Sequence, residues 1–457
     1  MSEVLELANF DQVSLMGWLT FLLSLAGFAW FYRRRFAATG VMTTDVWFVF
    51  YYVIAQNFLL LPLAYSELNL LVLGDALPAY LQSVDAVTAI SIIGTVAFCV
   101  GARRGWRRKT MPPGLPLMQD LLQRLTIGHR SYVWALAFLL PPLLGMMVLG
   151  VPYGQARAMA QNDAQIQVLN NFLNSAVQLI LTTSICLWYF HRSGRSVLLL
   201  VLVFVASFYG GTRSASVWPV ILSGAVILHH RRFKNVLPVL AGAGFLVWVS
   251  LFYAAYRNQA TGTESTNDSL VAELLFGGHL TEMRDFVWVY SLWDGDYLWG
   301  KSYLAGLLGF IPSSLSDFRL EWGWGKVTTR LVGYDTELFS GFRLPVFGEV
   351  FFNFSYPGVI AVGLVFGYLV FSAARSLERS QRVPAAQRST SRSPFAVVAS
   401  TAIYLNLVQL TLVSVTIFSV YIQLLSIFAL ALFAKAGARR RRSPPSHPAA
   451  IANSVPD

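Results

Sequence analysis

Hydrophobic and polar residues are arranged along this chain in long blocks. Runs of about 18 or more apolar residues recur between residues 14 and 434, and short polar or basic segments separate them. A helix of this length can cross the hydrocarbon core of a bilayer, whereas a membrane β-barrel has alternating segments of about 10 residues. The pattern therefore predicts an all-α polytopic membrane protein.

The apolar runs predict about eleven transmembrane helices. The last run is too long for one crossing, so we expect it to divide near residues 413–416. We find no internal repeat, which argues against a secondary transporter. The predicted spans are residues 14–32, 46–65, 86–101, 132–150, 172–190, 197–209, 217–230, 236–256, 351–374 and the two halves of 395–434.

The basic residues are distributed unequally between the two sides of this map. The ends of the odd-numbered spans hold 25 of the 34 Lys and Arg residues, and the opposite side holds nine. Because basic residues concentrate in cytoplasmic loops, this asymmetry predicts an outside N-terminus and a cytoplasmic C-terminus. The net charge of +11 therefore indicates topology rather than nucleic-acid binding.

Four regions follow from this map. Residues 1–256 contain the first eight spans, and residues 257–350 form a large outer loop with interfacial helices. Residues 351–434 contain the last three spans, and residues 435–457 form a basic tail that we expect to be disordered. In a bacterium the outer side is the periplasm, which has no nucleotide-sugars, so chemistry there requires an activated substrate such as a lipid-linked one.

Arginines at the outer membrane boundary are candidate anion ligands. Arg213 lies in GGTRSAS, between two apolar spans. A guanidinium at this depth either reaches out to the interface or meets an anion such as a lipid phosphate. Gly210 and Gly211 would allow a ligand to approach the backbone closely. The same two interpretations apply to Arg257 and to Arg157, which lie in other outer segments.

Two outer segments supply candidate bases. His279 is the only histidine on the predicted outer side, and Glu282 and Asp285 share one face of a helix. This segment can also be an ordinary solvated helix with internal ion pairs. Glu349 lies where the ninth span enters the membrane, so it is either a base with a raised pKa or the partner of an arginine such as Arg343.

Outer aromatic residues and carboxylates are candidates for sugar stacking and for metal binding. Tyr303 and several outer tryptophans could stack on sugars, but an interfacial aromatic belt has the same composition. Asp294 and Asp296 are the only weak suggestion of a metal site, and the chain has no nucleotide-binding loop or GxSxG motif. We therefore expect neither a metal nor another cofactor.

Four stretches, in this order, resemble the Wzy-type O-antigen polymerases, which join oligosaccharide repeat units. They are GGTRSAS, RDFVWVYSLWDGDYLWGKSYL, GFIPSSLSDF and LPVFGEVFFNFSYPGVIAVGLVFG. The chain departs from the family pattern at two positions. Ser313 stands where the family often has Arg, and Ser355 where it often has Gly.

The resemblance implies a fold similar to the GT-C class and an enzyme of the bacterial inner membrane. It would transfer a growing glycan from undecaprenyl pyrophosphate to a lipid-linked repeat unit, aided by a chain-length regulator protein. Glu349 would be the base, with Glu282 and His279 as alternatives. The expected substrate-binding residues are Arg213, Arg257, Arg284, Arg343, Arg157 and Tyr303.

Three other functions remain open at this point. An O-antigen ligase, which moves finished glycan onto a lipid core, would share the arginine-rich outer loop. A transporter of lipid-linked sugar would need charged residues within its spans, and the first five spans have few. The last alternative is a non-catalytic scaffold or an acyltransferase. Acyl transfer would need a His–Asp pair on the outer side, which the sequence does not indicate.

Overall fold

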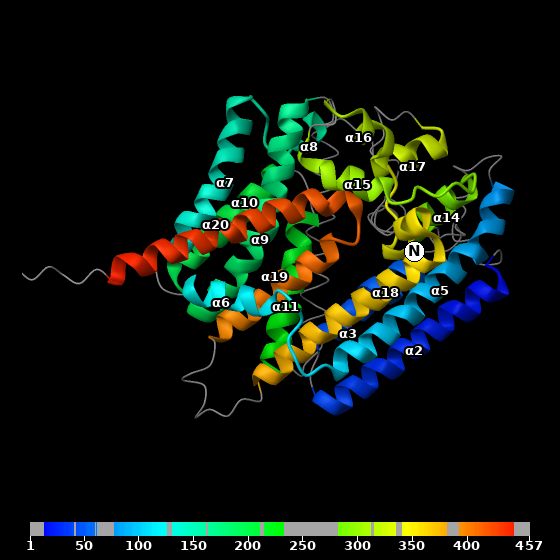
Figure 1. Cartoon of the computed structure of the whole chain (residues 1–457), viewed down its shortest axis with the longest axis horizontal. Helices are drawn as coiled ribbons and strands as arrows, with labels where there is room; N and C mark the ends of the chain where they lie inside the picture. The colour runs from blue at the N-terminus through cyan, green and yellow to red at the C-terminus, as the bar shows by residue number, and fades with distance from the viewer. Residues whose placement is uncertain are drawn as a thin grey trace, which may run out of the picture.

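The computed structural model describes residues 13–40, 43–59, 61, 77–125, 130–160, 163–210, 214–232, 282–311, 315–334, 341–381 and 393–442. Within these ranges the chain is helical and contains no strand (Figure 1). Four helices are long and apolar enough to cross a membrane: α2 (Leu15–Thr39), α5 (Leu77–Arg107), α9 (Ala164–His191) and α18 (Val346–Gln381). These features agree with the predicted all-α membrane protein.

Shorter elements complete the described structure. Five further helices are largely apolar, namely α7 (Arg130–Val148), α10 (Gly194–Tyr209), α11 (Ser214–His230), α19 (Pro394–Leu410) and α20 (Ile417–Arg442). The remaining elements are α3 (Thr44–Phe48), the π-helical η2 (Val49–Leu59), α6 (Leu115–Leu125), α8 (Ala156–Met159), α14 (Glu282–Ser291), α15 (Lys301–Leu307), η5 (Leu308–Phe310), α16 (Asp317–Trp322), α17 (Trp324–Val332) and η8 (Ser414–Thr416).

Helix boundaries follow from local sequence signals. Ser14 caps α2 by accepting the Gly17 N–H, and the helix ends at Gly40, which has a positive φ of 66°. Helix α19 begins with Pro394, directly after the cap Ser393. These signals lie at the edges of apolar runs, so pattern and capping define the same helices.

The structure changes several predicted boundaries. The last apolar run does divide at residues 413–416, where η8 separates α19 from α20. Helix α6 was not predicted, and α20 continues to Arg442, so residues 435–442 are helical rather than part of a disordered tail. The predicted span 236–256 and residues 443–457 lie outside the described residues, and the count of eleven spans stays a prediction.

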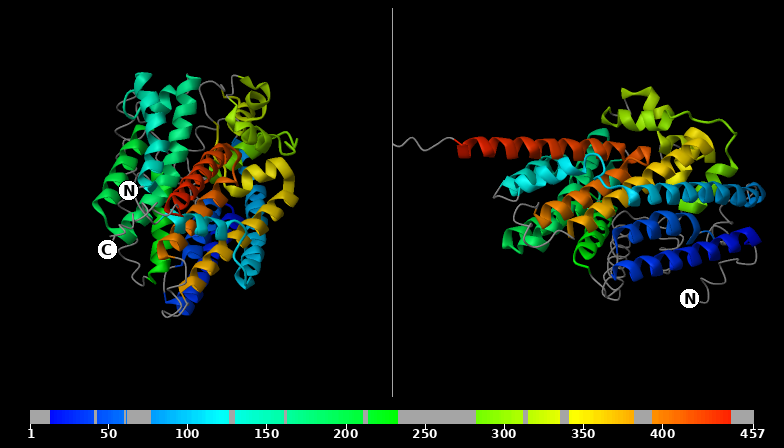
Figure 2. Two further views of the ribbon diagram at one scale, coloured as in Figure 1. Left: turned by 60° about the vertical axis from the view of Figure 1, so that its left-hand side comes forward. Right: turned by 60° about the horizontal axis from the view of Figure 1, so that its bottom comes forward.

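Helices α5 and α18 pack with their backbones in close contact (Figures 1 and 2). Gly363 and Gly367 form a GxxxG motif on α18. A Cβ atom at Gly367 would overlap the carbonyl of Phe98, and one at Gly101 would overlap the carbonyl of Leu364. Small residues therefore allow this helix pair to approach as membrane helices often do.

Replacing Gly367 with leucine is expected to lower the free energy of unfolding by about 1–3 kcal/mol, because the side chain would force α5 and α18 apart. Thermal unfolding in detergent measures the effect. Gly27→Leu is the matched control, since a Cβ at this position on α2 meets nothing within 4 Å. Equal unfolding temperatures for the two variants would contradict the close packing.

A buried ion-pair network lies at one end of the bundle. Arg35 on α2 binds Asp45 on α3 (Nε to Oδ2, 2.7 Å) and Glu378 near the end of α18 (Nη2 to Oε1, 2.8 Å). His229 on α11 lies 3.8 Å from the same Glu378 oxygen and accepts the Thr44 N–H at 3.2 Å. The network therefore brings the ends of the predicted first, seventh and ninth spans to one side of the bundle.

The helices of the predicted outer loop gather at the other end of α18. Helices α14, α15, α16 and α17 lie together beside its first turns, at the upper right of Figure 1. The N–H of Leu298, just before α15, donates to the carbonyl of Phe352 on α18 at 2.9 Å. This end of the bundle holds most of the candidate site residues.

Candidate active site

Helix α18 is interrupted near its start. Ser355 has non-helical angles (φ 54°, ψ −159°), and Pro357 follows it without an N–H to donate. The interruption exposes polar groups that the preceding loop satisfies, because Leu298 binds the Phe352 carbonyl and Ser355 Oγ binds the Tyr297 hydroxyl at 2.9 Å. The segment before α15 is thereby attached to the entry of α18.

Glu349 lies in the first turn of α18 and is 2% exposed. Its Oε1 accepts the Ser302 hydroxyl at 2.8 Å, and its Oε2 accepts the Ser414 N–H at 3.0 Å. Asn353 donates to Ser302 Oγ at 2.8 Å and to the Glu349 carbonyl at 2.9 Å. One carboxylate thus joins α18, α15 and η8.

The hydrogen bonds to Glu349 come from two other elements. Ser302 is in the first turn of α15 and Ser414 begins η8, so one hydroxyl donor and one backbone donor meet at the carboxylate. Tyr303 adds a second link by donating to the Leu412 carbonyl at 2.8 Å. Both Glu349 oxygens are bonded and buried, so the geometry favours a positioning role. Its predicted role as the base stays a prediction.

Glu282, the first residue of α14, has a different environment. The residue is partly exposed, but its Oε2 is buried and has no hydrogen-bond partner among the described residues. Burial, helped by the nearby charge of Asp285, raises the pKa of this carboxyl to about 7, although a hydrogen bond from the Glu282 backbone and the charge of Arg343 oppose the shift. A carboxylate with a pKa near neutrality and an oxygen without a hydrogen-bond partner suits general-base catalysis.

Tyr51 connects Glu282 to the membrane helices. Its ring centroid lies 4.8 Å from that of Trp218 on α11, and its hydroxyl bonds to the Gln56 side chain. Tyr51 is also within electrostatic range of Glu282 and Arg343. We call Glu282, Arg343, Tyr51, Gln56 and Trp218 the Glu282 cluster. Among the described residues, Gln56 Oε1 and Trp218 Nε1 are buried without a hydrogen-bond partner, so the cluster contains one unsatisfied acceptor and one unsatisfied donor.

The remaining outer arginines occupy distinct positions. Arg284 binds its neighbour Asp285 through Nη2 (2.8 Å) and Nε (2.9 Å), which is the internal ion pair that the sequence left open. Arg343 is exposed and lies within electrostatic range of Glu282. Both roles as phosphate ligands stay predictions.

Several predicted site residues cannot be placed relative to Glu282. Arg213, Arg257 and His279 lie outside the described residues. Arg157 belongs to α8, but its side chain is not among those described. In sequence, Arg213 directly precedes α11, the helix that carries Trp218.

Sequence reasoning missed polar residues inside the predicted spans. Tyr51, Gln56 and Trp218 were counted as parts of apolar runs. A directional amide chain was also missed, in which each member donates to the next: Tyr52, Gln409, Asn406, Gln423 and Gln178. This chain links η2, α19, α20 and α9, and polar side chains within long apolar runs were the signal that could have found it.

Metal-binding groups are sparse in the described part of the chain. It contains no cluster of three or more His, Cys, Asp or Glu side chains that could hold a metal ion. Asp294 Oδ1 accepts the backbone N–H of Asp296 at 3.1 Å, so this pair forms a turn.

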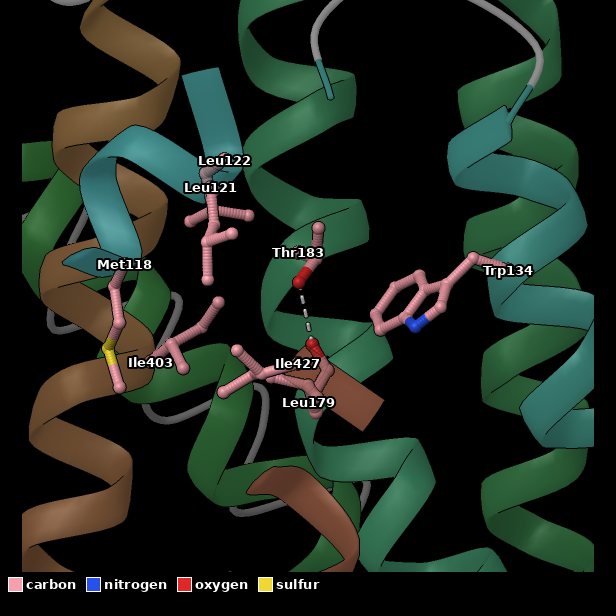
Figure 3. Close-up of a pocket in the computed structure, with 8 residues that line it drawn as sticks. All are labelled: Met118, Leu121, Leu122, Trp134, Leu179, Thr183, Ile403 and Ile427. Carbon is pink, nitrogen blue, oxygen red and sulfur yellow. Dashed lines mark hydrogen bonds between the residues drawn. The ribbon is translucent and has the colours of Figure 1, made fainter. Parts of the chain in front are cut away.

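An apolar pocket among α6, α7, α9, α19 and α20 includes no residue of the Glu282 cluster (Figure 3). Its polar atoms are occupied, because Thr183 donates to the Leu179 carbonyl at 2.9 Å and Trp134 Nε1 donates to the Ser426 carbonyl at 2.9 Å. The pocket therefore lacks groups for catalysis. Its lining residues are Met118, Leu121, Leu122, Trp134, Leu179, Thr183, Ile403 and Ile427.

Comparisons with known proteins give no relative: no protein-family model, no curated protein and no solved structure matches this chain. The functional interpretation therefore depends on the site itself and on the sequence motifs. Among the described residues, the Glu282 cluster combines a carboxyl with a raised pKa, a cation within electrostatic range and unpaired polar atoms.

Proposed function

We propose that this protein is a glycosyltransferase that polymerises undecaprenyl-pyrophosphate-linked oligosaccharide repeat units. It would act at the periplasmic face of the bacterial inner membrane, in the synthesis of O-antigen or a related surface polysaccharide. The observation that carries the proposal is the environment of Glu282. One of its carboxylate oxygens is buried and has no hydrogen-bond partner among the described residues. The carboxyl has a pKa near neutrality, and the cation Arg343 is within electrostatic range. This pair stands at one end of an all-α membrane bundle, where a lipid-linked substrate can present its head group.

The proposed reaction requires one base and one anion-stabilising group. Glu282 removes the proton of the acceptor hydroxyl as its oxygen bonds to the anomeric carbon of the donor glycan. The bond from that carbon to undecaprenyl pyrophosphate breaks, and the pyrophosphate leaves with the electron pair. Arg343 stabilises the developing negative charge, together with Arg213 and Arg257, which the sequence predicts as further anion ligands.

Other members of the Glu282 cluster would orient the acceptor. Tyr51 and Trp218 offer aromatic surfaces to a sugar ring. Gln56 Oε1 can accept a sugar hydroxyl, and Trp218 Nε1 can donate to one. Glu349 would act at a distance by fixing α15 to η8 beside the entry of α18.

Reconstitution of the purified protein with a synthetic polyprenyl-pyrophosphate-linked repeat unit tests the proposal. We expect a ladder of products that differ by one repeat unit, formed without added nucleotide. Two results would replace the proposal with another function. Transfer of preformed glycan onto a lipid core, without a ladder, would identify a ligase, and movement of intact substrate across the bilayer would identify a transporter.

A further inference from the structure

Helix α15 has an inverted distribution of polar and apolar residues. Its buried side carries Ser302, which donates to Glu349, and Ala305. Its outer side carries Leu304 and Leu307, which are 47% and 45% exposed and lie one turn apart. A helix on a water-soluble surface has the opposite arrangement, with apolar residues inside and polar residues outside. The outside of α15 is therefore suited to an apolar environment.

The residues around α15 extend the same surface. Trp299 lies just before Gly300, the N-cap of the helix, has a positive φ of 50° and is 75% exposed. Phe354 and Tyr356, at the interruption of α18, are also exposed. The Phe354 ring stacks on the ring of Tyr303 on α15, with 5.8 Å between the ring centroids. Exposed aliphatic and aromatic side chains thus adjoin one another at this end of the bundle, an arrangement that marks an interaction surface.

This surface continues into a helix whose own exterior is apolar. Gly306 contacts the backbone of Ser414, and a Cβ at Gly309 would lie 3.3 Å from Phe418 on α20. Val415, next to Ser414, is exposed, as are Leu424 and other apolar residues farther along α20. Lipid that covers the apolar flank of α20 would therefore reach α15 without a gap.

A cation stands at the edge of this surface. The Lys301 ammonium lies 3.6 Å from the centroid of the Trp322 ring. Lysine and tryptophan together are typical of the headgroup layer, where an aliphatic stem stays in an apolar region and the charge reaches polar groups. The combination distinguishes a lipid surface from a purely apolar protein interface.

We propose that α15 lies in the headgroup layer of the membrane, with Trp299, Leu304 and Leu307 inserted into the lipid. The partner of this surface is a lipid leaflet, not water and not another protein. The α15 end of the bundle is then a cap held in the interface, which keeps Glu349 and the entry of α18 close to the lipid surface. The proposal does not depend on the enzymatic activity.

Site-directed spin labelling of the full chain in liposomes tests this placement. Leu304→Cys and Leu307→Cys are labelled in a Cys99→Ser, Cys186→Ala background. Leu23→Cys on exposed α2 is the lipid-facing control, and Asp317→Cys on exposed α16 is the polar control. We expect spin labels at positions 304 and 307 to collide more often with oxygen than with a water-soluble nickel chelate, as the label at position 23 does. At position 317 the nickel chelate should collide more often than oxygen.

Two results would overturn the proposal. Labels at 304 and 307 that prefer the nickel chelate would place α15 in water. Low accessibility to both reagents, relieved when the protein is diluted into excess lipid, would show that a second copy covers the surface. If the cysteine substitutions prevent folding, a photoreactive residue at position 304 in the otherwise native chain shows whether lipid or protein contacts this position. Cross-links to lipid chains support the proposal, and cross-links only to protein, or to neither, contradict it.

Discussion

Glu282→Gln is expected to reduce polymerisation by about 10²–10⁴-fold, because an amide cannot accept the proton of the acceptor hydroxyl. The substitution is nearly isosteric, and Glu282 Oε2 has no hydrogen-bond partner in the structure to lose. Folding should therefore be preserved. Initial rates of ladder formation in proteoliposomes measure the effect, with equal amounts of inserted protein.

A matched carboxylate shows whether the loss is specific to the site. Glu321 on α16 is exposed, so Glu321→Gln makes the same chemical change outside the Glu282 cluster and should leave the rate within about twofold. A Glu282→Gln protein that polymerises as fast as the Glu321→Gln protein would remove Glu282 from the mechanism.

Glu349→Ala is expected to act through stability. It removes the acceptor of the Ser302 hydroxyl and of the Ser414 N–H, both of which are buried. An orphaned buried donor costs about 1–3 kcal/mol, so two of them predict a loss of about 2–6 kcal/mol in the free energy of unfolding. Thermal unfolding in detergent should show a much lower midpoint than for the wild type.

The conservative variant separates stability from chemistry. Glu349→Gln keeps an oxygen for one donor, so it should lose less stability than Glu349→Ala. In contrast, Glu321→Ala removes an exposed carboxylate and should have little effect. If Glu349→Ala unfolds at the wild-type temperature but is inactive, Glu349 takes part in the reaction directly and its positioning role is wrong.

The sequence predicted those parts of the fold that follow from long apolar runs. The division of the last run at residues 413–416 is an example, because its length exceeded one membrane crossing. Helix α6 was not predicted, since its 11 residues are too few to span and its apolar residues occupy one face only. Helix α20 was predicted too short, because hydropathy ends where its basic residues begin although helical propensity continues.

The candidate site was predicted in part. Spacing on a helix identified Glu282 and Asp285, and position identified Glu349. The contacts of Glu349 could not be predicted, because Ser302 and Ser414 are separated from it by 47 and 65 residues. No periodicity encodes contacts over such distances.

Residues inside the spans were missed for another reason. Tyr51, Gln56 and Trp218 lie in runs whose other residues are mostly apolar, so average hydropathy conceals them. Their proximity depends on how η2 packs beside α11, which the sequence of either segment does not reveal.

The pH dependence of the wild-type rate tests the role of Glu282 most directly. Burial raises the pKa of this carboxyl from 4.5 to about 7, so below that pH the folded protein holds the proton and the base is blocked. With saturating substrate, the account predicts a rate that rises about tenfold per pH unit up to about pH 7 and is constant above it, while the residual rate of Glu282→Gln lacks this inflection. A wild-type rate that is independent of pH between about pH 5 and about pH 8, or an inflection that persists in Glu282→Gln, would contradict it.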